Sequence, residues 1–89
     1  MKILELREKL NIKGVPSDMY SLDGWTPFEK MCIEKRGGEW HVYFSEKGSK
    51  QGLKIFKKED DACEYFYKCV MWDFNAYLEW KNKSTINLL

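Results

Sequence analysis

The sequence predicts an α+β domain with the element order α-β-β-β-α, in which a three-stranded antiparallel sheet has helices packed on one face. Three observations predict it: apolar residues at helical spacing near both ends of the chain, a Gly-Gly pair between two β-type runs, and a third alternating run after them. With 89 residues, 44% of them hydrophobic, the chain is expected to form a single domain over residues 1–89.

The first predicted element is an amphipathic helix from Lys2 to about Lys13. Ile3, Leu6 and Leu10 recur at helical spacing with charged residues between them. Gly14 and then Pro16 are expected to end this helix. Residues 14–28 are rich in turn-forming types, so we predict an irregular segment there.

A β-hairpin is predicted around Gly37 and Gly38, because both residues of a two-residue turn can take positive φ when they are glycine. In that register one face is apolar and includes Trp40 as a core residue. Cross-strand partners on this face are Ile33 with Val42, Met31 with Phe44, and Lys35 beside Trp40. The other, outer face pairs Glu34 with His41, Cys32 with Tyr43, and Lys30 with Ser45.

The third predicted strand runs from Leu53 to Lys57. Its alternation is interpreted with Leu53 and Ile55 pointing into the core and Phe56 on the outer face. The sheet would then have one core face and one mixed, partly aromatic face.

The last predicted element is a helix from Glu59 to about Asn82 with only a narrow polar stripe. Such a helix is about 36 Å long, whereas a strand of six residues spans roughly 20 Å, so its second half should extend past the sheet. Either the first helix or another protein chain should then cover four of its large apolar side chains: Trp72, Phe74, Tyr77 and Trp80. The final residues, 84–89, are expected to be either frayed or docked.

Charge and cysteine content limit the classes of function. Fifteen basic residues nearly balance 14 acidic ones, and no stretch resembles a signal peptide or membrane span, so we expect a cytoplasmic protein without membrane binding. The three cysteines include no CxxC pair, and Cys63 and Cys69 point in different directions from one helix. We expect reduced, partly buried thiols, no metal site and no cofactor.

The element order is that of double-stranded-RNA-binding domains, which place lysines at the start of the last helix to bind phosphates. Here Lys57 and Lys58 are followed by four acids: Glu59, Asp60, Asp61 and Glu64. Acids at this position stabilise the helix dipole but repel a phosphate backbone. We therefore do not expect nucleic-acid binding.

Catalysis is not expected either. His41 opposite Glu34 could form a general base with its orienting carboxylate, and Cys32 lies diagonal to it, but a solvent-facing cross-strand pair is the simpler interpretation. The sequence contains no glycine-rich phosphate loop and no HExxH motif, and no catalytic residue is assigned.

The segment from Tyr20 to Phe66 resembles a group of small bacterial proteins. The shared pattern is Tyr-Ser-Leu-Asp-Gly, then Cys-x-Glu, then Gly-x-Trp-x-Val-Tyr-x-Ser-Glu-Arg-Gly, and finally Phe before an acidic Ala-Cys helix start. The matching positions here are Tyr20 to Gly24, Cys32, Glu34, Gly38, Trp40, Val42, Tyr43, Ser45, Glu46, Gly48, Phe56, Glu59, Ala62 and Cys63. Two positions differ: Lys47 replaces an arginine and Trp25 a second glycine.

This group is the immunity proteins of polymorphic-toxin and contact-dependent inhibition systems. The resemblance implies a protein that binds and neutralises a partner toxin domain, often a nuclease, by occluding its active site or a nearby surface. The alternative is a self-associating structural or regulatory module that forms a homodimer through its aromatic C-terminal helix.

An inhibitor of a cationic nuclease needs acids to steer association and aromatic residues to anchor it. The candidate partner-binding residues lie in the long loop, on the outer sheet face and at the start of the last helix: Asp18, Asp23, Trp25, Glu34, His41, Tyr43, Phe56, Asp60, Asp61 and Glu64. Local roles compete with this interpretation. Asp23-Gly24 favours a turn, and the acids Asp60, Asp61 and Glu64 suit helix capping.

Overall fold

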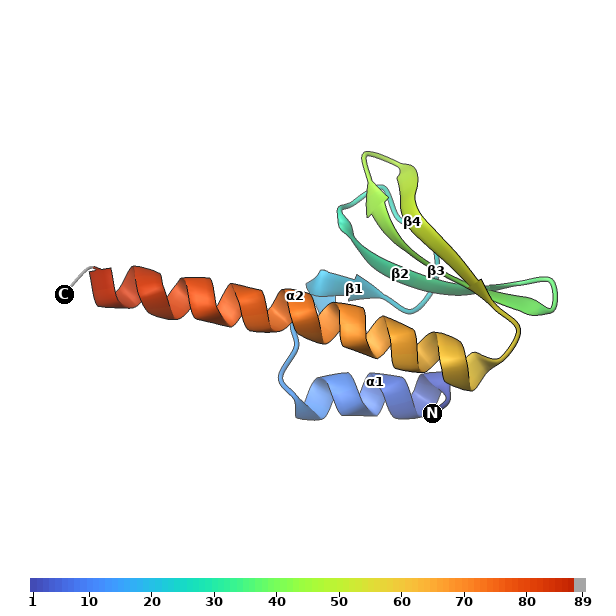
Figure 1. Cartoon of the computed structure of the whole chain (residues 1–89), viewed down its shortest axis with the longest axis horizontal. Coiled ribbons are helices and arrows are strands. Elements are labelled where there is room, and N and C mark those ends of the chain that lie inside the picture. Colours follow the sequence, from blue (N-terminus) through green and yellow to red (C-terminus); the bar gives the residue numbers. More distant parts are fainter. Residues whose placement is uncertain (88–89) are drawn as a thin grey trace.

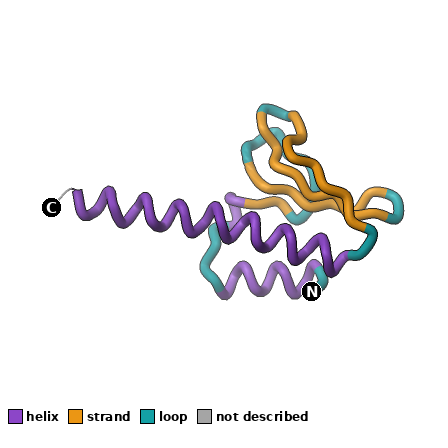
Figure 2. Tube along the Cα trace, in the orientation of Figure 1, coloured by secondary structure: helices purple, strands orange, loops and turns teal. Residues whose placement is uncertain are grey.

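Two helices lie on the same side of a four-stranded sheet in the computed structural model, which describes residues 1–87 and the side chains of residues 1–83 (Figures 1 and 2). The helices are α1 (Ile3–Ile12) and α2 (Glu59–Asn87), and a short 3-10 helix, η1 (Ser17–Met19), follows α1. The strands are β1 (Tyr20–Ser21), β2 (Lys30–Arg36), β3 (Glu39–Glu46) and β4 (Ser49–Phe56), adjacent in that order. The α+β class and the placement of both helices are as predicted, but the sheet has four strands and is mixed.

Helix α1 matches its predicted range, and it buries Leu6 and Leu10 against the core. At its end Gly14 has φ +77°, and the N–H groups of Gly14 and Val15 donate to the carbonyls of Asn11 and Leu10. This is a Schellman ending, which glycine adopts without a Cβ penalty. At its start the Glu59 carboxylate, from α2, accepts the Ile3 N–H at 2.9 Å. The acidic start of α2 therefore also caps α1.

The predicted hairpin register is confirmed at every predicted pair, including Ile33 with Val42 and Glu34 with His41. Strand β1 was not predicted. It pairs in parallel with β2, and Tyr20, buried opposite Met31, packs edge-on against Phe66 with ring centroids 6.5 Å apart. A two-residue strand inside a turn-rich segment has too few residues to show an alternating pattern.

The predicted faces of the third strand are wrong. In β4, Phe56 pairs with Trp40 and packs against the core, whereas Leu53 and Ile55 are exposed on the outer face. The register of β4 shifts by one residue between Val42 and Phe44, beside Gly52 at φ +62°. Because apolar residues occupy both phases of this strand, the pairing with Trp40 determines which side faces inward.

Helix α2 begins at Glu59 as predicted and continues to Asn87, past the predicted end near Asn82. Its second half extends beyond the sheet and beyond α1 (Figure 1), and the molecule measures 52 × 28 × 16 Å. Phe74 is buried, but Trp72, Tyr77 and Trp80 are 78%, 43% and 65% exposed. Helix α1 therefore does not cover these three side chains. The backbone is helical as far as Asn87, residues 88–89 lie outside the described part of the chain, and the expectation that residues 84–89 are frayed or docked stays a prediction.

The core lies between the sheet, α2 and α1. Trp40 is half-buried and packs against it, as predicted. Its buried members are Leu6, Leu10, Val15, Tyr20, Met31, Ile33, Val42, Ala62, Cys63, Phe66, Val70 and Phe74. Neither described helix combines the length and apolar character that crossing a bilayer requires.

Candidate functional site

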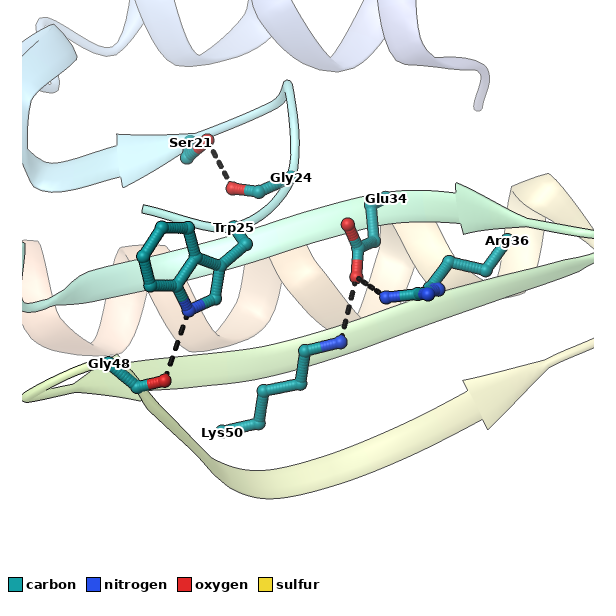
Figure 3. A network of polar contacts seen from close by, with 7 residues as sticks. All are labelled: Ser21, Gly24, Trp25, Glu34, Arg36, Gly48 and Lys50. Atoms are coloured by element: carbon teal, nitrogen blue, oxygen red, sulfur yellow. Dashed lines mark hydrogen bonds and ion pairs between the residues drawn. The ribbon is translucent and has the colours of Figure 1, made fainter. Parts of the chain in front are cut away.

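The segment between β1 and β2, residues 22–29, lies over the outer face of the sheet, the face turned away from the helices (Figure 3). Hydrogen bonds from side chains hold this β1–β2 loop. The Ser21 hydroxyl donates to the Gly24 carbonyl at 2.8 Å, the Trp25 indole N–H donates to the Gly48 carbonyl at 3.1 Å, and the Ser45 hydroxyl donates to the Thr26 carbonyl. The loop and the β3–β4 turn are therefore tied together across the sheet.

Gly24 lies close to the sheet, against the side chain of Glu34. Its φ is +97°, and a Cβ added to it would lie 2.6 Å from the Glu34 Oε2 atom. The residue pair Asp23-Gly24 thus has the turn role expected of it, with an additional steric requirement for glycine at position 24.

Glu34 is the electrostatic centre of the outer face. Lys50 Nζ lies 3.1 Å and Arg36 3.7 Å from its Oε1 atom (Figure 3). Burial acts to raise the pKa of Glu34, but the hydrogen bond and charge of Lys50, with Arg36, outweigh it and hold the pKa below its ordinary value. Glu34 is therefore ionised and already neutralised within the chain.

Acidification is expected to weaken the fold through Glu34. The pKa of Glu34 is lower in the folded than in the unfolded chain. The free energy of unfolding that Glu34 contributes is therefore complete when the pH is above its ordinary pKa of 4.5, and it is lost as the pH falls through the pKa of the folded chain. Urea unfolding of the wild type and of Glu34→Gln, compared from about pH 6 to about pH 3, should show a stability difference that shrinks with falling pH. A difference that stays constant over this range would contradict the role of Glu34.

Two outer-face residues, Tyr43 and Cys32, are buried beneath the loop. Lys50 Nζ lies 4.7 Å from the centroid of the Tyr43 ring, and burial together with the nearby Glu34 charge raises the pKa of the Tyr43 hydroxyl. That hydroxyl is near the Glu34 carboxylate without meeting hydrogen-bond geometry, and the His41 Nδ1 atom also has no partner among the described residues. Tyr43 lies on the predicted face but is inaccessible to a partner in this conformation.

Phe56 is the one candidate that lies on the wrong face. Its ring packs 5.5 Å from that of Tyr65, on the helix side of the sheet. Asp18 is exposed on η1, and Trp25 remains 53% exposed above the sheet. Asp23 is also exposed, 4.0 Å from Arg7. The outer face and its loop therefore bring together Trp25, Glu34 and His41, whereas Asp23 lies beside Arg7 of α1 and Phe56 lies on the helix side.

The acids at the start of α2 form a separate group on the helix side. The Asp60 carboxylate lies 3.2 Å from the Met1 amino group and 3.5 Å from Lys2, and its hydrogen bond with that amino group lowers the pKa of Asp60. Asp61 and Glu64 are exposed. Glu59 thus caps α1 and Asp60 pairs with the amino terminus, which differs from the predicted capping of the last helix, and Asp61 and Glu64 remain accessible.

Sequence reasoning missed three exposed apolar residues near the outer face. Phe28 in the loop is 68% exposed, and Leu53 and Ile55 on β4 are 43% and 51% exposed.

The described residues contain no group of His, Cys, Asp or Glu side chains arranged to hold a metal ion. All three cysteines are free thiols. Burial, with Glu34, raises the pKa of Cys32, and burial, with Glu59, raises the pKa of Cys63 to about 11. These two thiols are therefore protonated at neutral pH and poorly nucleophilic.

Comparisons with protein-family models, with curated proteins and with solved structures found no match to this chain.

Proposed function

We propose that this protein is an immunity protein, which binds a toxin domain in the cytoplasm and neutralises it by covering its active site or a nearby surface, with no catalysis of its own. The observation that carries the proposal is a set of exposed apolar side chains on β4 and in the β1–β2 loop. It comprises four large side chains: Trp25, Phe28, Leu53 and Ile55. Exposed aromatic and aliphatic side chains grouped on one side of a small domain are typical of a protein-binding surface.

The chemistry of this surface suits a protein partner. Trp25 can act as an anchor because its indole is held by Gly48 while half of the residue stays exposed. Asp23, in the same loop, keeps a 91% exposed side chain although it lies 4.0 Å from Arg7, so it can contribute to steering a cationic domain. Ion pairs within the chain already neutralise Glu34, so steering depends on the exposed acids around the apolar surface and not on Glu34.

The residues that carry the sequence resemblance also support the proposal. Ser21, Gly24, Ser45 and Gly48 hold the β1–β2 loop over the sheet, and Gly24 touches Glu34. Four positions of the shared pattern thus serve one structural feature, a loop held over the outer face, whereas Trp25, which this loop presents to solvent, is a position where the chain differs from the pattern.

The test is co-expression with the toxin domain encoded beside this protein, scored by growth and then by co-elution of the two chains. We expect growth rescue and an equimolar complex. Ile55→Glu, on the exposed outer face, should abolish rescue because it buries a charge in the interface.

Leu4→Glu is the matched control, because Leu4 is also exposed but lies on α1. This variant should rescue growth like the wild type. If cells die despite abundant folded protein and no complex elutes, the proposal is refuted for that pair. If both variants lose rescue equally, the outer face is not the binding surface.

A further inference from the structure

An apolar groove lies between the sheet and α2, at the point where the helix begins to extend past the strands. Its volume is about 530 Å³, and two core-face strand residues and four helix residues line it: Met31, Phe44, Lys68, Cys69, Trp72 and Asp73. Phe44 and Trp72 give it apolar walls, and Trp72 is itself 78% exposed. The groove is large enough to hold an aromatic side chain.

The same helix carries a side chain that fits such a groove. Trp80 is 65% exposed, and the neighbouring Tyr77 ring, 6.4 Å away, supports its indole. Trp80 follows Trp72 by about 12 Å, and the two point about 40° to either side of Ala76. Ala76 is exposed and small, so a second helix can approach closely there.

We propose that a second copy of this chain docks antiparallel along the extended half of α2, so that Trp80 of each copy enters the groove of the other. An antiparallel pair centred on Ala76 places residue 80 of one helix level with residue 72 of its partner. A parallel pair would place the two Trp80 side chains together and leave both grooves empty. The groove and the side chain that fills it lie on one chain at matching spacing, as a two-fold symmetric interface requires.

The polar groups at the groove are compatible with this arrangement. Asp73 makes no salt bridge within the described part of the chain, and its carboxylate lies at the groove where Trp80 of the second copy would enter. The indole N–H is an uncharged donor that can bind this carboxylate. The extended half of α2 also gains packing, which a single projecting helix lacks.

The exposed aromatic area that two copies can bury sets the expected affinity of the dimer. With exposed fractions of 78%, 65% and 43% for Trp72, Trp80 and Tyr77, two copies offer roughly 900 Å² of aromatic surface. With the groove walls added, the interface reaches the lower end of the range for specific complexes. We therefore expect a reversible dimer with a dissociation constant in the micromolar range.

Sedimentation of the full chain over a concentration series tests this dimer. Trp80→Ala should weaken it by roughly 100-fold or more, because each interface contains two copies of the anchor. Leu4→Ala, at an exposed apolar residue of α1, should leave it unchanged. Circular dichroism checks that the variants are folded.

Cross-linking tests the register independently. Ala76→Cys should form a disulfide between copies under mild oxidation, since residue 76 faces its own equivalent across the two-fold axis. The nearest cysteine on the same helix face, Cys69, is about 10 Å along the axis, too far for a bridge within one chain. Asn82→Cys, about 120° around the same helix, is the control and should cross-link much more slowly.

Three results would each overturn the proposal. The chain could stay monomeric up to about 1 mM, the dimer could be insensitive to Trp80→Ala, or the two cysteine variants could cross-link equally. The outer face of the sheet stays free in this dimer. Trp80→Ala should therefore still neutralise the toxin, so failure of the dimer and failure of the proposed function give different results.

Discussion

Phe66→Ala is expected to reduce the free energy of unfolding by about 3–5 kcal/mol, a large share of the stability of a domain this small. Phe66 is completely buried on the sheet-facing side of α2, and its ring contacts the edge of Tyr20. Truncation removes the buried ring and leaves a cavity that the sheet and helix cannot close, because both are rigid elements. Loss of the Phe66 ring should also remove the packing contact of Tyr20 and so weaken the pairing of the short parallel strand β1.

The measurement is urea unfolding followed by tryptophan fluorescence. Leu4→Ala is the control, because α1 presents Leu4 to solvent at 79% exposure, and its stability should change by less than about 0.5 kcal/mol. A loss below about 1.5 kcal/mol for Phe66→Ala would show that the core is not built around this ring.

Gly24→Ala is expected to destabilise the chain by about 2–3 kcal/mol through two separate effects. The first is the positive φ of +97°, which L-residues rarely adopt, and the second is the 2.6 Å approach of the new Cβ to Glu34. Relief of that contact moves Glu34 away from Lys50 or lifts the β1–β2 loop off the sheet.

Gly14→Ala separates the two effects. Gly14 has a comparable φ of +77°, but nothing lies within 4 Å of its added Cβ, so this variant measures the backbone cost alone. Gly24→Ala should cost more, and the excess should fall in a Glu34→Ala background, which removes the Oε2 atom from the contact. Equal costs for the two glycines, or an excess that is unchanged without the Glu34 carboxylate, would contradict this close approach.

The candidate site shows where sequence-based prediction worked and where it did not. The placement of Glu34, His41 and Tyr43 on one face followed from the Gly37-Gly38 turn, because a two-residue turn determines the pairing of the residues beside it. The placement of Phe56 and Ile55 was reversed because β4 has apolar residues in both phases, and the pairing with Trp40 turns Phe56 inward. Hydrophobic alternation alone cannot determine the phase of such a strand.

The burial of Tyr43 has a different cause. Its position on the outer face was predicted correctly, but the β1–β2 loop and Lys50 cover it. Contacts such as Trp25 with Gly48 join residues far apart in the chain, and no local pattern reports them. The partner-binding role of the accessible candidates stays a prediction.

The sequence by itself determined the elements whose information is local: helix α1 with its glycine ending, the hairpin with its register, and the start of α2 at an acidic turn. Only the tertiary structure decided the features that depend on distant residues. These are the parallel pairing of β1, the inward side of β4, and the loop over the outer face. Local signals act through propensity and periodicity, whereas these features depend on which buried surface and which hydrogen-bond partner the folded chain supplies.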